Sequence, residues 1–353
     1  MLTLLLLTVA GGLASSIGIV ILTTRWAQKR NVLDHPNERS LHLQPTPRGG
    51  GVGVVLPLSL VLAGVACFVP ESRVSAAWIG GTGAIIAAAG LADDVWGLSA
   101  VTRLAIYGAT AILFAINAGV WRNVAWPGIG SIDLMWLSVP LTVVLIVSLT
   151  NAYNFMDGID GIAGTQSAIA GLGWIGIGCS LQEPLFCVTG AVIASSSLGF
   201  LLFNWPPARV FMGDVGSAYL GFTFAALAVL AASRAPEAAT AGILFVWPFV
   251  FDTSLTFLRR MARRENLLRA HRTHLYQRLV LTGVPQRTVT LIYGSLALVG
   301  AGVGMAALRG ESVASRAGVV LIGVLAGGLW LAVNRREQSA VARVRPIEEV
   351  GRR

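Results

Sequence analysis

Long apolar runs alternate with short polar segments along almost the whole chain. Eleven of these runs reach or approach about 17–25 residues, the length that an α-helix needs to cross the hydrocarbon core of a bilayer. The strict alternation of apolar and polar residues that marks membrane-spanning β-strands is missing. We therefore predict an all-α, polytopic integral membrane protein. The predicted spans are 2–24, 51–70, 75–92, 101–119, 135–150, 161–180, 185–203, 216–233, 239–258, 288–308 and 313–333.

The composition supports a membrane protein and excludes an ordinary soluble domain. Of the 353 residues, 55% are hydrophobic and only 12% are charged, whereas soluble domains carry about 25% charged residues. The net charge of +9 would raise the question of nucleic acid in a soluble protein. In a membrane protein the same excess is expected from cytoplasmic loops rich in Lys and Arg, so we expect no nucleic-acid partner.

The distribution of basic residues predicts the orientation. An odd number of spans places the two ends of the chain on opposite sides of the membrane. With the N-terminus outside, 21 of the 26 Lys and Arg residues fall in inside segments, as the positive-inside rule requires. We predict one transmembrane domain over residues 1–333 and a polar cytoplasmic tail over 334–353. The predicted inside segments are 25–50, 93–103, 150–161, 204–216 and 259–287.

The third inside segment is unusually polar for its place between two apolar runs. Asn151, Asn154, Asp157 and Asp160 are spaced by three, and in one helix such steps fan over roughly 180°. We therefore predict a break, with the Asn pair ending one helix and the Asp pair starting the next. Ordinary capping would explain one Asp but not four polar residues.

Other acidic residues fall on the same predicted face. Asp93 and Asp94 directly follow an apolar run, and adjacent carboxylates repel each other unless a divalent cation or a proton relieves the repulsion. A solvated pair in a loop is the alternative. Asp214 precedes an apolar helix at a position suited to an N-cap. Asp252 lies within a predicted span and is expected to face protein instead of lipid.

Two inside segments carry groups that suit an anion. Residues 45–51 read Pro-Thr-Pro-Arg-Gly-Gly-Gly and include Thr46; such a turn presents backbone N–H groups to an anion, unless it is only a flexible linker. The segment 259–287 is strongly basic and contains His271, Arg272 and His274. It is either an interfacial helix on anionic lipid or a source of donors to phosphate oxygens.

Carboxylates that hold a divalent cation, ringed by Arg and His at helix ends, are typical of a phosphoryl-transfer site where a soluble substrate meets a lipid one. An ion-coupled transporter would place acids or broken helices at mid-span, where only Asp252 is found. A prenyltransferase would carry two Asp-rich metal motifs, and only one Asp-x-x-Asp occurs. A structural membrane protein would leave the inside acids unexplained.

Together these motifs resemble the polyprenyl-phosphate N-acetylhexosamine-1-phosphate transferases. The resemblance rests on Asp93-Asp94, on 151–161, on 204–217 and on His271-Arg272-Thr273-His274, and it covers the whole chain. It implies that a UDP-activated N-acetylated sugar gives its sugar 1-phosphate to undecaprenyl phosphate at the cytoplasmic face of the bacterial inner membrane. UMP is released, Mg²⁺ or Mn²⁺ is required, and a homodimer is implied.

The resemblance also implies roles for particular residues. Asp93 would be the base that keeps the lipid phosphate ionised, with Asp94 beside it, and Phe211 would stack on uracil. The implied catalytic residues are Asp93, Asp94 and Asp157, and the implied metal ligands are Asp214 and Asp157. The implied substrate-binding residues are Thr46, Asn151, Asn154, Asp160, Asn204, Phe211, His271, Arg272 and His274.

The histidine motif bears on the branch of the family. The muramoyl-pentapeptide branch carries three consecutive histidines where this chain has His271-Arg272-Thr273-His274. The motif, followed by Leu275-Tyr276-Gln277, resembles instead the O-antigen-type initiating branch. We therefore predict UDP-GlcNAc, UDP-FucNAc or UDP-QuiNAc as donor, with the pentapeptide transferase of peptidoglycan synthesis as the alternative.

Overall fold

Each of the eleven apolar runs forms a helix or, in one case, a pair of helices in the computed structural model. The structure describes residues 2–34, 36, 44–126, 130–267, 269 and 271–350, with the backbone alone for 2 and 341–350. Parts of the predicted inside segments (35, 37–43, 268 and 270) and of the tail (351–353) therefore lie outside the described residues.

The helices are α1 (Leu2–Arg30), α2 (Val52–Phe68), α3 (Arg73–Trp96), α4 (Ala100–Asn117), α5 (Ser138–Met156), α6 (Ile162–Leu181), α7 (Pro184–Asn204), α8 (Asp214–Ala232), α9 (Pro236–Leu244), α10 (Trp247–Ala262), α11 (Leu275–Leu281), α12 (Gln286–Leu308) and α13 (Ser312–Val350). Two antiparallel pairs of short strands complete the fold: β1 (Leu33–Asp34) with β2 (Thr46–Pro47), and β3 (Asn123–Trp126) with β4 (Gly130–Asp133).

The helices confirm an all-α polytopic membrane protein. Within the described chain, nine helices are long and apolar enough to cross a membrane, and a bent pair would make ten. That pair corrects the predicted span 239–258, because α9 and α10 meet at 74°. Pro248 lies in the first turn of α10, where its missing N–H favours the start of a new helix. The run 51–70 forms the shorter α2, so eleven crossings stay a prediction.

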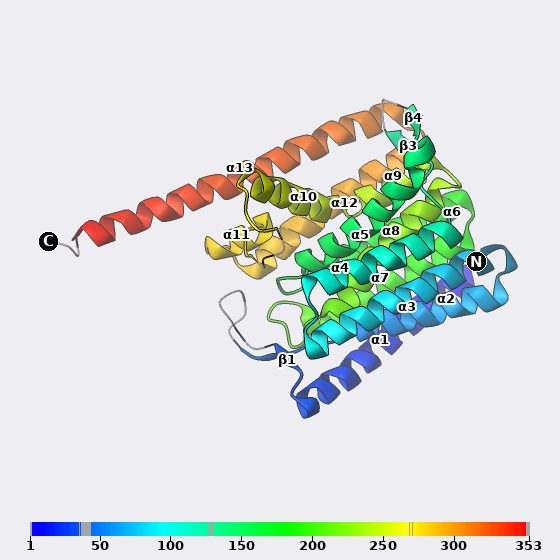
Figure 1. Ribbon diagram of the computed structural model, residues 1–353, viewed down its shortest axis with the longest axis horizontal. Coiled ribbons are helices and arrows are strands. Elements are labelled where there is room, and N and C mark those ends of the chain that lie inside the picture. The colour runs from blue at the N-terminus through cyan, green and yellow to red at the C-terminus, as the bar shows by residue number, and fades with distance from the viewer. Residues whose placement is uncertain are drawn as a thin grey trace.

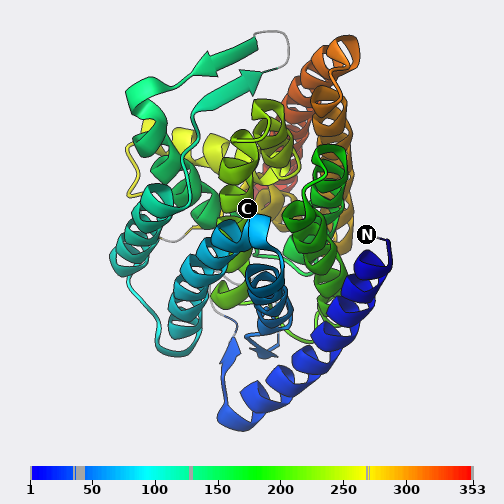
Figure 2. The ribbon, with the colours of Figure 1, turned by 90° about the vertical axis from the view of Figure 1, so that its right-hand side faces the viewer.

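The bundle has a buried centre and an exposed rim. All of the span of α8 is buried, against 17% of the spans of α1 and α13. Figure 2 shows α1 inclined at the edge of the bundle. Close contacts inside the bundle depend on small residues: a Cβ at Gly171 of α6 would lie 2.6 Å from the backbone nitrogen of Ala194 in α7. Small residues at such positions let membrane helices approach closely.

The two ends of the bundle differ. Figure 1 shows β3 and β4 at the end where α1 begins, and β1 and α11 at the opposite end, beyond which α13 projects. The segments predicted to lie inside thus gather at one end. α13 continues without a break from the last predicted span to Val350, and the division into a transmembrane domain and a tail at residue 334 stays a prediction.

Candidate active site

An arginine joins two of the predicted carboxylates. Asp93 lies in the last turn of α3 and Asp214 is the first residue of α8. The Nη1 atom of Arg103, in the first turn of α4, lies 2.6 Å from Asp93 Oδ2 and 2.8 Å from Asp214 Oδ2. A carboxylate near the C-terminus of a helix opposes the helix dipole. Asp93 is therefore at an unfavourable place, whereas Asp214 at the start of α8 is favoured by the dipole, and one guanidinium balances both charges.

Asp94 caps the helix that carries Asp214. Its Oδ1 accepts a hydrogen bond from the Asp214 N–H at 2.9 Å, and its Oδ2 accepts one from Val215 at 3.1 Å. Sequence analysis placed Asp214 itself at the N-cap, and this was wrong: the N-cap is Gly213, with φ of +76°. A carboxylate 120 residues earlier in the chain supplies the cap, and no local pattern reveals such a partner.

The glycine-rich segment docks on the same place. Phe211 N–H donates to the Pro47 carbonyl at 2.9 Å, and Gly51 N–H donates to the Met212 carbonyl at 2.8 Å. A Cβ at Gly51 would lie 2.6 Å from the Cα of Gly216, so the approach requires glycine. Thr46 is buried, and its hydroxyl donates to the Gln44 carbonyl. These contacts place the first inside segment beside the fourth.

The break between α5 and α6 is confirmed, but its position differs from the prediction. Asn151 and Asn154 do end a helix, since α5 runs to Met156. Asp157 is the C-cap of α5, and Asp160 lies in the connecting turn before α6 begins at Ile162. Neither aspartate starts the next helix, because Gly161 takes the left-handed conformation that redirects the chain.

Three of these polar residues serve the structure around them. Asn151 donates to the Val147 carbonyl of its own helix, and Asn154 donates to Ser217 Oγ of α8 at 3.0 Å. Asn204 is buried and uses both ends of its amide, accepting from Gly161 N–H and donating to the Val210 carbonyl. Asn204 therefore joins the α5–α6 turn to the α7–α8 loop.

Asp160 strengthens the same junction. Its Oδ2 accepts from Ala208 N–H at 2.9 Å, and its own N–H donates to Gln286 Oε1 of α12 at 3.0 Å. The third and fourth inside segments are thus held together by backbone and side-chain bonds.

Asp157 has a different environment. Its half-buried carboxylate accepts no hydrogen bond from the part of the chain that the structure describes. Burial, followed by the negative charge of Asp94, raises its pKa from an ordinary 3.8 to about 7, and the distant charge of Arg48 only partly opposes this. A divalent cation would relieve this strain, and carboxylate oxygens are the ligands that Mg²⁺ prefers.

The acidic donors therefore fit a hard cation without forming a finished cage. Among the described residues, no three Asp, Glu, His or Cys side chains are arranged to hold a metal. Arg103 takes up one oxygen of Asp93 and one of Asp214. A metal held by Asp214 and Asp157 stays a prediction.

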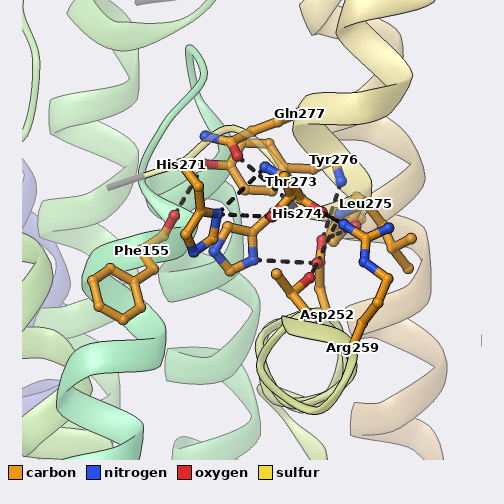
Figure 3. Close-up of polar contacts among 11 residues, drawn as sticks. Phe155, Asp252, Arg259, His271, Thr273, His274, Leu275, Tyr276 and Gln277 are labelled. Carbon is orange, nitrogen blue, oxygen red and sulfur yellow. Dashed lines mark hydrogen bonds and ion pairs between the residues drawn. The ribbon is translucent and has the colours of Figure 1, made fainter. Parts of the chain in front are cut away.

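The basic segment is built around Asp252 (Figure 3). Asp252 is fully buried in α10 and accepts from the N–H groups of Leu275 and Tyr276, at 2.8 and 3.1 Å, and from the Tyr293 hydroxyl at 2.6 Å. His274 Nδ1 lies 3.3 Å from the same carboxylate. The expectation that Asp252 faces protein is confirmed, and its role is to anchor the start of α11.

The histidines of this segment face the α5–α6 turn. His271 and His274 stack at 5.1 Å, and His274 lies 6.3 Å from the ring of Phe155. The Tyr276 hydroxyl donates to the Phe155 carbonyl at 2.9 Å. The fifth inside segment therefore joins the third.

The hydrogen bonds of His271 indicate its tautomer. Its Nδ1 faces the Thr273 N–H at 3.4 Å and the Thr273 hydroxyl at 2.9 Å; because a backbone N–H only donates, Nδ1 is the acceptor. Burial, followed by the nearby His274 and Arg260, lowers the pKa of His271 to about 4. His271 is thus neutral at pH 7, and its Nε2–H, for which the described residues provide no partner, is a donor suited to an anion.

Sequence reasoning missed three residues of this site. Arg103 is the single basic residue of the second inside segment, and that isolation was a usable signal. Ser217 and Gln286, by contrast, show no local pattern that points to their partners in other segments.

Comparison with known proteins decides the family. Residues 76–232 match glycosyl transferase family 4. The chain is 31% identical over 289 residues to a protein of Bacillus subtilis (strain 168) named a probable undecaprenyl-phosphate N-acetylglucosaminyl 1-phosphate transferase, with 79% of each chain covered. It is 33% identical to the decaprenyl-phosphate N-acetylglucosaminephosphotransferase of Mycolicibacterium smegmatis, over 80% of this chain and 78% of that one.

The chain belongs to the polyprenyl-phosphate N-acetylhexosamine-1-phosphate transferase family. It is a multi-pass membrane enzyme of the glycosyl-1-phosphate transferase type. A phospho-N-acetylmuramoyl-pentapeptide-transferase of Synechococcus sp. is 31% identical over 198 residues, which cover 52% of this transferase and 56% of that protein. The family match at 76–232 contains Asp93, Asp94, Asp157 and Asp214. The histidine segment lies outside that match.

Proposed function

We propose that this transferase moves an N-acetylated sugar 1-phosphate from a UDP-sugar to undecaprenyl phosphate, at the cytoplasmic face of the bacterial inner membrane. An oxygen of the acceptor phosphate attacks the sugar-bearing phosphorus of the donor. The bond between that phosphorus and the bridging oxygen breaks, and UMP leaves with that oxygen. The product is a polyprenyl-diphosphate-linked sugar that initiates an O-antigen or a related surface glycan.

The observation that carries the proposal is the group of Asp93, Arg103 and Asp214 at neighbouring helix ends. Two anionic phosphates must approach each other, so fixed positive charge is needed where they meet. Arg103 supplies such a charge beside the carboxylates. Asp93 is the proposed base that keeps the acceptor phosphate ionised, and Asp94 fixes Asp214 through the first turn of α8.

The remaining residues serve the donor. Asp214 and Asp157 would hold Mg²⁺ or Mn²⁺, which would neutralise the charge of the diphosphate. Phe211, in the loop that Asn204 and Asp160 fix, is proposed to stack on uracil. His271 offers a neutral donor to the diphosphate, with Arg272 and His274 beside it. Thr46 and Asn154 are proposed to bind substrate at the edges of the same site.

The names of the relatives favour UDP-GlcNAc over UDP-FucNAc and UDP-QuiNAc as donor. The partial similarity to a pentapeptide transferase keeps UDP-MurNAc-pentapeptide as the second candidate. Against it stands the motif His271-Arg272-Thr273-His274, which lacks the three consecutive histidines of that branch. All four donors belong in one screen.

The test is UMP release from each donor by the purified full-length enzyme, with undecaprenyl phosphate and Mg²⁺. Asp214→Ala and Asp93→Asn should abolish release, whereas Asp133→Asn, in the β3–β4 hairpin at the other end of the bundle, should not. Turnover like the wild type in both site variants would refute the proposed site. Release from UDP-MurNAc-pentapeptide alone would replace the donor assignment.

A further inference from the structure

The last helix of the chain reaches the basic segment. α13 continues past residue 333, where the last predicted span ends, and α11 packs against this continuation (Figure 1). Arg278 of α11 is buried, with 7% of its surface exposed. Its Nε donates to Glu337 Oε1 at 2.6 Å, and its Nη2 donates to Glu337 Oε2 and to Asn334 Oδ1, the latter at 2.7 Å.

This contact has the geometry of a strong ion pair. A guanidinium that meets both oxygens of one carboxylate in a fork fixes orientation as well as distance. The carboxylate of Glu337 also faces the charges of Arg259 on α10 and of Arg263, the C-cap of that helix. One acidic group of α13 thus balances several arginines of the basic segment.

The same contact reaches the histidine motif through a single helical turn. His274 is the N-cap of α11, and Arg278 N–H donates to the His274 carbonyl at 2.9 Å. Asp252 holds the start of α11, and Glu337 holds its next turn. Without the second anchor, the turn of α11 that follows His274 loses its charged contact with α13, and the hold on His274 then rests on Asp252 and on the bond of the Tyr276 hydroxyl to the Phe155 carbonyl.

We infer that Asn334 and Glu337 of α13 form a brace that positions the donor-binding segment of the active site through Arg278. The inference rests on the proposed function for the identity of the donor. It assigns a task to the part of α13 beyond the predicted span 313–333. Glu337 and Asn334 touch no substrate and act through α11, so they are positioning residues.

The experiment compares Glu337→Ala and Glu337→Gln with Gln338→Ala, a neighbour that is exposed on α13, in the full-length enzyme in nanodiscs. Hydrogen exchange at the amides of Leu275–Leu281 should rise in both Glu337 variants and stay unchanged in the control. The KM for the UDP-sugar should rise about tenfold, a cost like that of losing a group that orients a metal ligand. The KM for undecaprenyl phosphate should not change.

The outcomes separate the two proposals. Unchanged exchange in α11, or faster exchange with an unchanged KM for the donor, would overturn the brace. If Glu337→Ala fails to fold, Glu337→Gln decides, since it keeps the volume and one acceptor oxygen. The double variant Arg278→Glu/Glu337→Arg, in which the two charges are swapped, should restore much of the protection of α11 against hydrogen exchange. A wild-type enzyme that releases no UMP would refute the proposed function, and the exchange data would still decide the brace.

Discussion

The active site joins two regions that are built on opposite principles. The acidic region, Asp93, Asp94, Asp157 and Asp214, crowds carboxylates at helix ends around Arg103. The basic region, His271–Arg278 with Asp252, surrounds one buried carboxylate with donors from α10, α11 and α12. The first region is electrostatically strained without a ligand, whereas the second is stabilised by its own contacts.

This difference indicates how the two regions are used. Strain held at a functional site is relieved when a ligand arrives, and its usual cost is lower stability of the free protein. A preorganised platform keeps its geometry whether or not a ligand is bound. Changes in the acidic region should therefore reduce activity and spare stability, and changes around Asp252 should reduce stability first.

The largest expected effect is on catalysis in the acidic region. Asp214→Asn removes a carboxylate that pairs with Arg103, and transfer should fall by about 10³-fold or more, as when a group that stabilises the transition state is lost. The melting temperature should stay the same or rise, because one repulsive charge is gone. Activity assays and calorimetry on the same preparation check both parts. A strongly destabilised Asp214→Asn protein would show that the acidic region is structural.

The second-largest expected effect is a loss of stability in the basic region. Asp252→Ala leaves two backbone N–H groups, a tyrosine hydroxyl and His274 without their acceptor. Unfolding should become easier by about 3 kcal/mol, the cost of breaking a buried network. The matched control is Thr253→Val, which removes a buried hydroxyl that has no partner in the described chain and should be neutral. Equal stability of both variants would contradict the view that the basic region is stabilised by its own contacts.

The sequence predicted the acidic region better than the basic one. Apolar runs located the helices, and the position of each aspartate beside a run placed these side chains at one end of the bundle. The spacing of Asn151, Asn154, Asp157 and Asp160 showed that a helix must break. It did not show where, because the left-handed turn at Gly161 decides that.

Contacts between distant segments set the limit of prediction. Asp94 caps α8 from 120 residues away, and Asp252 holds residues 22 to 41 positions further along the chain. Hydropathy identifies Asp252 as buried but not its partners. The bend at α9 and α10 was missed because an apolar run of sufficient length looks the same whether it is straight or broken.

The third prediction uses the dependence of stability on pH to test the electrostatic strain at Asp157. Its pKa is raised to about 7, so the folded protein binds a proton that the unfolded chain loses near pH 4. This contribution to stability is present at low pH and is lost as pH rises through about 7. In the absence of divalent cations, Asp157→Asn should remove this dependence of stability on pH. At pH 8 it should increase the free energy of unfolding by about 1 kcal/mol, which raises the melting temperature by about 2 °C.

Magnesium gives the same prediction a second measurement. A cation competes with the proton on Asp157, so the concentration of Mg²⁺ that half-saturates the wild-type enzyme should rise up to about tenfold per pH unit below 7. Thermal shift titrations check this without an activity assay. A half-saturating concentration that does not change between pH 5.5 and 7.5 would remove Asp157 from the metal site.

The smallest expected effect tests how Asp94 holds the strained region together. In Gly213→Ala, the new Cβ would lie 2.5 Å from Asp94 Oδ2, at a residue with φ of +76°. Gly97→Ala is the matched control, since Gly97 has φ of +71° and no atom near its added Cβ. Both variants carry a backbone strain of about 1 kcal/mol, and only the first displaces the carboxylate that caps α8.

Unfolding by denaturant should show Gly213→Ala less stable than Gly97→Ala by about 1 kcal/mol, the value of a helix cap. Equal stability would mean that the Asp94 cap contributes nothing to the fold and that this carboxylate is held in place for chemistry alone.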